Sequence, residues 1–278
     1  ASTDCNPLYI RINPYEGMKY TVAESYRNLI ACNINPLAIT NNLNFASPLD
    51  PNIMGELVLS IHGLKTAAVK FNTPIVSGNV SLYNQTNEIP IKPTPVIGMV
   101  GSNMDLNKIN TNKFCEIGNK ILILGKQLTK NCSPYLLQDQ KIAFNICEFN
   151  DLEVLDLDFE KKIANCVLEL SDLKCIMSCN DISRGGIFSA LLKMQYKDMG
   201  FRVKVPDPID LFCEYSAGYV IEIRSKDFEE VTSFLKKKGA EYLEIGEIIK
   251  EGIEINSKKF DYFDIMNKYR NDFEKIIS

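Results

Sequence analysis

The sequence predicts a chain of two domains that both combine helices with strands: an α+β first domain, in which helices lie on a sheet, and a mixed α/β second domain. Three observations support this fold class. Short apolar segments of strand length alternate with amphipathic segments of helix length along the chain. Its 278 residues are enough for one large or two ordinary domains with sizeable cores. A polar, asparagine-rich segment at 102–119 interrupts the alternation, so we assign residues 1–104 and 105–278 to separate domains.

The first domain is expected to carry short strands and two helices. Its second helix ends just before Thr73, where a new apolar segment begins. The predicted elements are, in order, a strand at 8–12, a turn at 13–17, a helix at 18–32, a strand at 37–40, a polar loop at 41–51, a helix at 53–71, a strand from 75, a turn at 84–88 and a strand at 94–101.

The second domain is expected to alternate strands and helices in the same way. One of its helices is opened by two adjacent glycines, Gly185 and Gly186. The predicted elements are strands at 120–125, 175–179, 219–223 and 243–249, helices at 158–170, 185–196 and 226–238, and a C-terminal helix.

Composition excludes several classes of protein. The net charge of −4 argues against a nucleic-acid-binding protein, which usually has a basic face. No apolar run approaches the roughly 20 residues of a membrane helix, and no signal peptide opens the chain. The nine cysteines form no CxxC pair, so we expect reduced thiols in a cytoplasmic protein. The single histidine, His62, lies in a helical pattern and is expected to be structural, which leaves no histidine-based triad.

The segment 73–84 is the most informative stretch of the sequence. Ile75 and Val76 lead into a small polar turn, Ser77-Gly78-Asn79, after which an apolar strand pattern resumes. Glycine lets the backbone approach an anion, and amide and hydroxyl oxygens suit a hard metal or a phosphate. The segment is therefore either a ligand site at the end of a buried strand or an ordinary tight turn.

Further oxygen-bearing side chains form a candidate magnesium site in the first domain. Glu24 and Asn28 are four residues apart, which places them on one face of the predicted helix. Asp4 precedes the first predicted strand. Carboxylate and amide oxygens without soft ligands suit Mg²⁺. The alternative is that Glu24 and Asn28 solvate a helix face and that Asp4 caps a turn.

The second domain has a comparable segment at 180–186. Asp181 follows a predicted buried strand, and two glycines precede the next helix. A helix N-terminus of this kind can bind an anion, and Asp181 could hold a metal there. The alternative is a simple helix start that is capped by Ser183.

Taken together, these segments resemble phosphoribosylformylglycinamidine synthase, the glutamine-dependent amidotransferase of purine biosynthesis. Their order and spacing agree with that family along nearly the whole chain. The matching runs are Thr3-Asp4-Cys5, Asn-Pro-Tyr-Glu-Gly at 13–17, Val-Ala-Glu-Ser-Tyr-Arg-Asn at 22–28, Pro-Leu-Ala-Ile-Thr-Asn-Asn-Leu-Asn-Phe at 36–45, the segment at 74–84, Pro-Thr-Pro-Val-Ile-Gly at 93–98 and, more weakly, Asn-Asp-Ile-Ser-Arg-Gly-Gly at 180–186.

The resemblance implies a two-domain architecture like that of aminoimidazole ribonucleotide synthetase, in which the first sheet pairs with a counterpart. The synthase chain consists of two related halves, and this sequence resembles the second half. The first methionine is Met18, so we expect the chain to be a piece of a longer protein. In the implied reaction, ATP phosphorylates the amide oxygen of formylglycinamide ribonucleotide. Ammonia from a glutaminase subunit or domain then displaces the phosphate.

The resemblance also assigns site residues. It implies Asn41 and Gly78 beside ATP, Asn79 on Mg²⁺ and Ser81 on the ribonucleotide. In large members, the residues that match Asp4, Glu24, Asn28 and Asp181 hold Mg²⁺ and the phosphates of a second, structural nucleotide, which can be ADP. The catalytic histidines of the family lie in the other half, so this chain is expected to contribute no catalytic residue and to be inactive alone.

Some positions depart from the family pattern. Asn41 stands where an aspartate is usual, Asn180 replaces a histidine and Arg184 replaces an aspartate. Arg184 could therefore pair with a phosphate directly. Ala46 and Ser47 replace a Gly-Asn pair.

Two alternative functions stay open at this point. The chain could be a structural platform whose nucleotide never reacts. It could also belong to a related enzyme group, such as aminoimidazole ribonucleotide synthetase, selenophosphate synthetase or thiamine-phosphate kinase. Since a sheet face normally covered by the missing half would be exposed, a homodimer is a further expectation.

Overall fold

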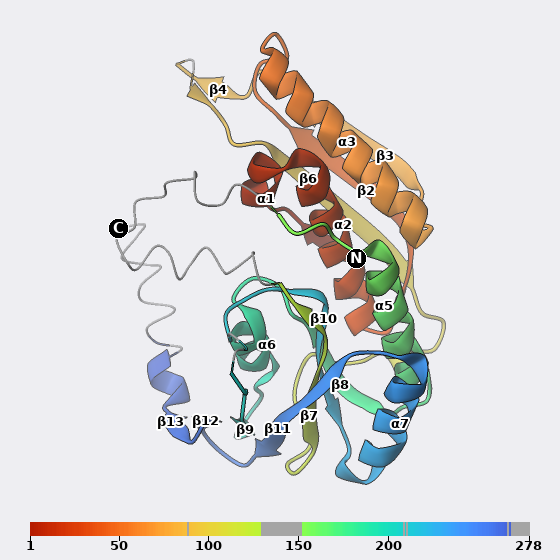
Figure 1. Cartoon of the computed structure of the whole chain (residues 1–278), viewed down its shortest axis with the longest axis vertical. Coiled ribbons are helices and arrows are strands. Elements are labelled where there is room, and N and C mark those ends of the chain that lie inside the picture. Colours follow the sequence, from red (N-terminus) through yellow and green to blue (C-terminus); the bar gives the residue numbers. More distant parts are fainter. Residues whose placement is uncertain (88, 129–151, 208, 210, 266, 268–278) are drawn as a thin grey trace.

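The computed structural model describes residues 1–87, 89–128, 152–207, 209, 211–265 and 267. The described residues form one large sheet in each half of the chain and a small two-stranded sheet within 85–90 (Figure 1). The elements of the first half are β1 (Ser2–Asp4), α1 (Pro7–Ile12), α2 (Pro14–Ala31), β2 (Asn35–Asn44), α3 (Pro51–Phe71), β3 (Ile75–Ser81), β4 (Gln85–Thr86), β5 (Ile89–Pro90) and β6 (Thr94–Ser102).

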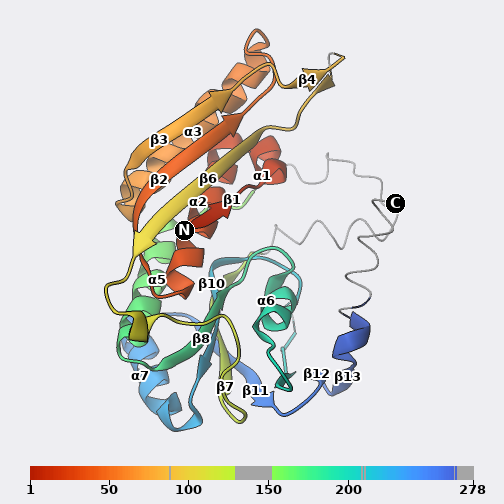
Figure 2. The same ribbon diagram turned by 180° about the vertical axis from the view of Figure 1, so that it is seen from behind.

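The first sheet has four strands in the order β1-β6-β2-β3. Only β2 and β3 are parallel, and β1 and β3 form its two edges. One face packs against α2 and α3, through buried residues such as Ile39, Leu43 and Ile97. Of the helices that the structure describes, none covers the other face (Figure 2). We call it the open sheet face; by alternation along the paired strands its side chains include Thr3, Thr40, Asn42, Asn79, Val96 and Val100.

The second half follows a 3-10 turn at Leu106–Lys108. Its strands form a seven-stranded sheet in the order β13-β12-β9-β11-β7-β10-β8. Its elements are β7 (Lys120–Gln127), α5 (Leu157–Asp172), β8 (Ile176–Asp181), α6 (Gly186–Met194), β9 (Gly200–Val203), β10 (Tyr215–Ile223), α7 (Phe228–Lys238), β11 (Tyr242–Ile249), β12 (Ile253–Ile255) and β13 (Lys258–Phe260).

Helices cover both faces of the second sheet. α5 and α7 pack on one face, where Leu122 and Tyr219 are buried, and α6 packs on the other, against Ile121 and Val220. The core on the α5 side is continuous with the core under α2, so the two halves share one hydrophobic cluster. α2 contacts both α5 and β8, and this packing brings the first domain beside the strand end at Asp181.

The prediction of a strand at 8–12 and a turn at 13–17 was wrong. Residues 7–12 form α1, and α2 begins at Pro14. Each start has the same local cause, because an asparagine caps the helix and a proline occupies its first position. The Tyr9 amide donates to Asn6 Oδ1 at 3.2 Å, and the Glu16 amide donates to Asn13 Oδ1 at 3.0 Å.

The predicted turn at 77–79 and the start of the predicted loop at 41 were also wrong. β3 runs through Gly78 and Asn79 without a break, and β2 extends through Asn41 to Asn44. β3 is moreover an exposed edge strand and not a buried one. The polar side chains that suggested a turn are tolerated because an edge strand can face water.

The helices predicted at 53–71, 158–170 and 226–238 and the strands at 94–101, 120–125 and 243–249 are present with small shifts at their ends. The strand predicted at 175–179 continues to Asp181, and the short strands β9, β12 and β13 were not predicted. Of the predicted C-terminal helix, only 262–265 and 267 are described as helical, and its remainder lies outside the described residues.

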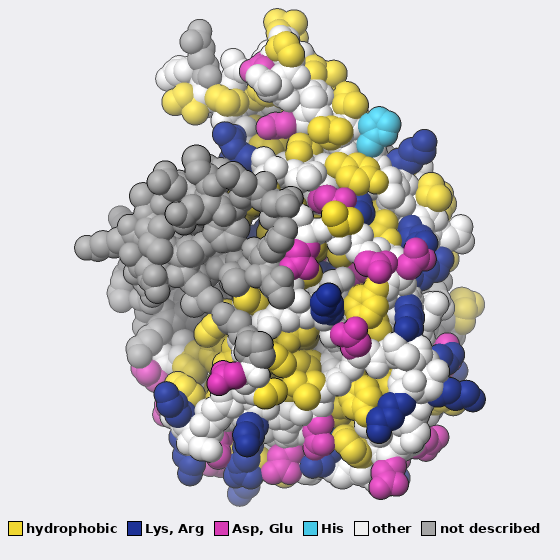
Figure 3. Space-filling model, in the orientation of Figure 1, with side chains coloured by type: hydrophobic (Ala, Val, Ile, Leu, Met, Phe, Trp, Pro, Cys, Tyr) yellow, Lys and Arg dark blue, Asp and Glu magenta, His cyan; other side chains and the backbone are white. Residues whose placement is uncertain are grey.

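The surface over α3 is unusually apolar for a helix that faces water (Figure 3). Val58, Leu59, Ile61 and Val69 are each between 44 and 73% exposed there. His62 also lies on α3 and is exposed. Seven described cysteines carry free thiols, while Cys132 and Cys147 lie outside the described residues.

None of the helices in the part of the chain that the structure describes is long and apolar enough to cross a membrane.

Candidate functional site

The structure brings Asp4, Glu24, Asn28 and Asp181 together from three elements and both halves of the chain. Asn28 Nδ2 donates to Asp4 Oδ1 at 3.0 Å, which joins α2 to the end of β1. Ser2 Oγ donates to the Ser25 carbonyl at 2.8 Å and gives β1 and α2 a second hydrogen bond. Asp181 ends β8, where α2 packs. We call Asp4, Glu24, Asn28, Asp181 and Glu214 the acidic cluster.

The electrostatics of this cluster show that its carboxylates crowd one another. Burial, followed by the charges of Asp4 and Asp181, raises the pKa of Glu24 to about 8. Burial also raises the pKa of Asp4, although hydrogen bonds from Ser25 and Asn28 oppose the shift. A group of acids that raise each other's pKa in a buried place is the arrangement that a bound cation relieves.

Glu214 belongs to the cluster but was not found from the sequence. It is 5% exposed and lies just before β10. Burial raises its pKa, while Tyr9, Arg27 and Arg184 lower it and Asp181 raises it further. No motif surrounds Glu214, and it lies 33 positions after Asp181, so only the folded chain reveals the relation.

The chemistry of the acidic cluster fits Mg²⁺. Asp4 Oδ2 and Asp181 Oδ2 are buried oxygens without a hydrogen-bond partner, and they come from different halves of the chain. Hard oxygen donors of this kind, with nucleotide phosphates and water completing the shell, suit this ion. Within the described residues, however, no three histidine, cysteine or acidic side chains converge closely enough to hold a metal by themselves.

The loop after Asp181 differs in one detail from its prediction. Ser183 does not cap the next helix, because α6 begins at Gly186 with Gly185 in the capping position and without a side-chain cap. Both glycines have positive φ, at +81° and +61°. A Cβ on Gly186 would lie 2.4 Å from the Leu211 carbonyl oxygen, so this turn needs glycine for space as well as for conformation.

The departures at Asn180 and Arg184 have structural roles here. Asn180 Nδ2 donates to the Asp181 carbonyl at 2.7 Å. Arg184 is exposed and donates through Nη2 to the Cys5 carbonyl at 2.9 Å, which joins the 180–186 loop to the chain just after β1. The Asn180 contact therefore holds the backbone at Asp181, and the Arg184 contact joins the loop after Asp181 to the first domain.

The second set of predicted residues, Asn41, Gly78, Asn79 and Ser81, lies on β2 and β3. We call it the sheet-edge cluster. In the parallel register Asn41 is opposite Gly78, Asn42 opposite Asn79 and Asn44 opposite Ser81. Alternation then places Asn41 and Gly78 on the helix-covered side of the sheet and Asn79 and Ser81 on its open face.

Contacts within the sheet-edge cluster are few. A Cβ on Gly78 would lie 2.7 Å from Asn41 Nδ2, so the Asn41 side chain fills the space that the glycine leaves. Asn79 Nδ2 donates to Asn42 Oδ1 at 3.3 Å on the exposed surface. Ser81 Oγ donates to Asn84 Oδ1 at 3.2 Å. The structure therefore splits the four predicted residues between the two faces of the sheet, and only Asn79 and Ser81 share the open face.

The two clusters lie at opposite edges of the first sheet. Asp4 is on β1 and the sheet-edge cluster includes β3, with β6 and β2 between them. At the usual spacing of strands, that separation is roughly 14 Å. A single metal ion therefore cannot be shared by Glu24 and Asn79 in this arrangement.

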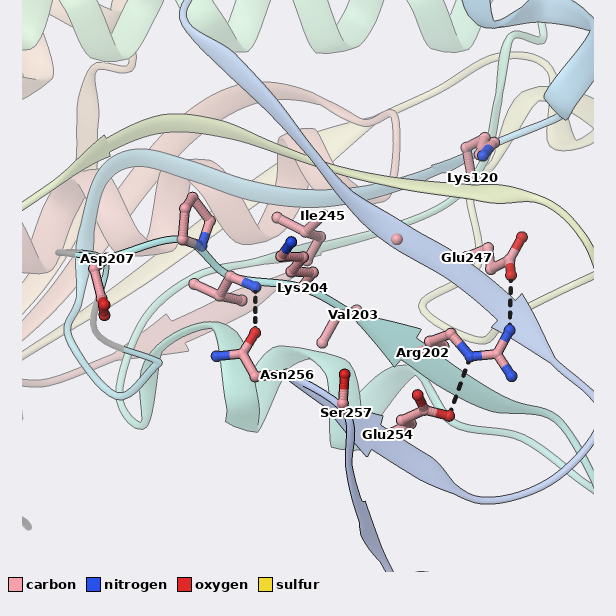
Figure 4. Close-up of a pocket in the computed structure, with 13 residues that line it drawn as sticks. Lys120, Arg202, Val203, Lys204, Asp207, Ile245, Glu247, Glu254, Asn256 and Ser257 are labelled. Atoms are coloured by element: carbon pink, nitrogen blue, oxygen red, sulfur yellow. Dashed lines mark hydrogen bonds and ion pairs between the residues drawn. The ribbon is translucent and has the colours of Figure 1, made fainter.

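A separate hollow of about 620 Å³ lies on the second sheet and is lined by residues of β7, β9, β11 and β12 (Figure 4). Arg202 points between two carboxylates, with Nη1 3.1 Å from Glu247 Oε1 and Nε 3.1 Å from Glu254 Oε2. Lys120 pairs with Glu244 at 3.1 Å. Because the charges neutralise one another, and because β9 is four strands away from β8, this hollow is separate from the acidic cluster.

Comparison with known proteins places this chain in a family. Residues 1–102 match the N-terminal domain of AIR synthase related protein, and residues 116–257 match its C-terminal domain. The chain belongs to the AIR synthase related family, and the resemblance that the sequence motifs predicted is confirmed.

The most informative relative is a synthase subunit. The chain is 34% identical over 281 residues to phosphoribosylformylglycinamidine synthase subunit PurL of Petrotoga mobilis, which covers 99% of this chain and 38% of that protein. The chain thus spans little more than a third of the length of this relative.

Solved structures agree on the fold. Thermotoga maritima PurL complexed with FGAR superposes with a TM-score of 0.71 at 15% identity, over 93% of this chain and 44% of that one. The same protein has been solved complexed with ATP and with ADP, and in a structure named PurLQS. Escherichia coli HypE, a hydrogenase maturation protein, has a TM-score of 0.69 at 15% identity, over 93% of this chain and 83% of that one. The predicted two-domain architecture is confirmed.

Proposed function

We propose that this chain is part of a phosphoribosylformylglycinamidine synthase, the ligase that forms an amidine from formylglycinamide ribonucleotide, ATP and glutamine-derived ammonia. The relation to PurL along 99% of the chain supports this choice over other members of the family. The fold alone does not discriminate, because HypE superposes almost as well as PurL. The enzyme would act in the cytoplasm, in purine biosynthesis.

The acidic cluster is the proposed site of a magnesium-bound nucleotide. The observation that carries this assignment is the meeting of Asp4, Glu24 and Asn28 with Asp181 of the other domain, with two buried carboxylate oxygens left unpaired. Glu24, Asp4 and Asp181 would supply oxygen ligands, and Asn28 would orient Asp4. Bound Mg²⁺ would neutralise the nucleotide phosphates.

The sheet-edge cluster is the proposed contribution of this chain to the reacting site. Gly78 and Asn41 would lie beside ATP, Asn79 would contact its Mg²⁺ and Ser81 would bind the ribonucleotide. ATP would phosphorylate the amide oxygen of this substrate, and ammonia would displace the phosphate. These side chains orient the reactants, and none of them is placed to move a proton.

The proposed partners follow from the exposure of the β3 edge and of the open sheet face. The open sheet face and the exposed β3 edge would be covered by the other synthase half, which would complete the pocket. A glutaminase subunit or domain would supply ammonia. We therefore propose that the isolated chain forms no amidine, and that adding the other half restores activity.

Calorimetry with Mg-ATP and Mg-ADP tests this proposal directly. We expect the chain to bind Mg-ADP, Glu24→Ala to lose that binding and Asn79→Ala to keep it. Detectable amidine formation by the isolated chain would contradict the proposal that the reaction needs the other synthase half. Loss of Mg-ADP binding in Asn79→Ala but not in Glu24→Ala would overturn the assignment of the acidic cluster.

A second candidate function is a platform that holds a nucleotide without reacting. It is favoured by the contrast between the buried acidic cluster and the exposed sheet-edge cluster. Reconstitution decides between the two. If Asn79→Ala and Ser81→Ala leave the activity of the reassembled synthase unchanged, the platform is the better description.

A further inference from the structure

Arg27 and Glu160 form an ion pair inside the contact between the two domains. Arg27 lies on α2 between Glu24 and Asn28, and Glu160 lies in the first turn of α5. Arg27 Nη1 is 2.9 Å from Glu160 Oε1, and the two side chains are 3% and 0% exposed. A charge buried this deeply is stable only with its partner, so each side chain fixes the position of the other's helix.

Glu160 also holds the irregular part of β10. The Ala217 amide donates to Glu160 Oε1 at 2.7 Å, and Ser216 Oγ donates to the same oxygen at 3.2 Å. Ala217 has φ +51°, in the left-handed region that a residue with a Cβ rarely adopts. The carboxylate therefore stabilises a backbone conformation that alanine does not favour by itself.

This irregular part of β10 leads directly to the acidic cluster. The carbonyl of the next residue, Gly218, accepts a hydrogen bond from the Ile182 amide at 2.9 Å. Tyr219 is the register partner of Asp181. A continuous set of contacts thus runs from α2, which carries Glu24 and Asn28, through Glu160 and β10 to the strand end that carries Asp181.

We propose that Arg27 and Glu160 are positioning residues for the acidic cluster. The pair holds α2 against β10 so that the ligands of the first domain face Asp181 of the second. Neither residue is among the proposed ligands of the ion, although the Arg27 charge lowers the pKa of Glu214. This inference rests on the proposed function of the acidic cluster as a Mg-nucleotide site.

The chain offers a matched control at the same domain contact. Glu16 Oε2 lies 2.9 Å from Lys19 Nζ and accepts the Leu155 amide at 3.0 Å. This link also joins α2 to the second half and is also buried. Glu16 is eight residues from Glu24, or about 12 Å along the helix, so it ties the domains without being next to the cluster.

The experiment compares Glu160→Gln with Glu16→Gln in the full chain, by calorimetry with Mg-ADP. We expect about a 10-fold weaker affinity in Glu160→Gln, which is the usual cost of removing a group that orients ligands. Glu16→Gln should bind Mg-ADP as the unaltered chain does. Equal weakening in both variants, or no weakening in Glu160→Gln, would overturn the proposal.

Two further measurements separate positioning from stability and from the proposed function. In the pair Arg27→Met with Glu160→Met, apolar side chains replace both charges and should preserve folding. We expect this double variant to fold, to melt at a lower temperature because the Ala217 amide and the Ser216 hydroxyl lose their acceptor, and to bind Mg-ADP weakly. Affinity equal to that of the unaltered chain would show that the pair acts on stability alone.

Hydrogen exchange tests the pair without any ligand. The amides of Ala217 and Ile182 should exchange faster in Glu160→Gln and at the original rate in Glu16→Gln. If the unaltered chain does not bind Mg-ADP, the proposed nucleotide site fails, whereas this exchange pattern would still support the positioning role. Unchanged exchange at both amides in Glu160→Gln would overturn that role.

Discussion

The acidic cluster and the sheet-edge cluster lie at opposite edges of one sheet and differ in how they are completed. The acidic cluster is buried and draws side chains from both domains, with Asp4 and Glu24 on one side and Asp181 on the other. The sheet-edge cluster lies on an exposed edge strand, and its contacts are confined to neighbouring asparagines and Ser81. We therefore propose that the acidic cluster can bind its ligand within this chain, whereas the sheet-edge cluster needs a second surface.

The largest expected effect is that of Glu24→Gln, which tests whether the acidic cluster binds Mg-ADP within this chain. Because this change removes the charge of a proposed metal ligand while keeping its shape, we expect Mg-ADP affinity to fall by about 100-fold or more. The ligand-free variant should at the same time gain about 1 kcal/mol of stability, since one of several crowded acids is gone. Calorimetry and thermal melting check both parts, and a variant that binds weakly without becoming more stable would contradict the crowding argument.

Self-association of the isolated chain is the next largest expected effect, and it concerns the open sheet face. We expect the chain to form dimers in which this face is covered. Val100→Glu should shift them to monomers, because a charge would be buried at the contact. Leu49→Glu, at an apolar residue outside the sheet that is even more exposed than Val100, is the control. Light scattering that shows a monomer at high concentration of the unaltered chain would contradict the expectation.

The pH dependence of the ligand-free chain gives a smaller effect. Glu24 has a pKa of about 8 in the folded chain against a reference value of 4.5, so its neutral form stabilises the fold. That contribution is fully present below about pH 4.5 and is lost as the pH rises through about 8. Mg-ADP affinity should rise over the same interval, because the ion requires the carboxylate. Denaturation at several pH values checks this, with a flatter profile expected for Glu24→Gln.

The smallest expected effect is that of Gly78→Ala in the sheet-edge cluster. The new methyl group would meet only the end of the Asn41 side chain, which can rotate away, so we expect a loss of less than about 1 kcal/mol. Gly101→Ala is the contrasting variant, since its Cβ would lie 2.5 Å from the Asn35 carbonyl oxygen, and it should destabilise more. Equal losses in urea denaturation would show that Asn41 is fixed more firmly than its few contacts suggest.

The sequence predicted the long elements well because their periodicity is strong, as at α3, α5 and β7. It failed at α1, where apolar residues at 8–10 and 12 looked like a strand and the Asn-Pro start was not taken as a helix signal. It also failed at Gly78 and Asn79, because glycine and asparagine indicate a turn locally. Pairing of the whole segment with β2, which overrides that local preference, depends on residues far away in the sequence.

The site was predicted unevenly for a similar reason. Glu24 and Asn28 follow from helical spacing, and Asp4 and Asp181 were candidates from their positions beside predicted strands. The resemblance joined the four in one site, and the fold brings them together. Glu214 and the pair of Arg27 with Glu160 could not be found in this way. Their relation depends on how the second domain packs against α2, which no local pattern encodes.

A row of charged side chains beside the hollow in Figure 4 helps to fix the register of the strands that carry it. Lys120, Glu247, Arg202, Glu254 and Lys259 are register partners across five adjacent strands, so their signs alternate in a straight line. A slip of one residue in β9 would turn Arg202 towards the α6 core and bury its charge. The alternating charges thus oppose the same slip that the buried Phe201, Val203 and Ile253 oppose on the other side of these strands.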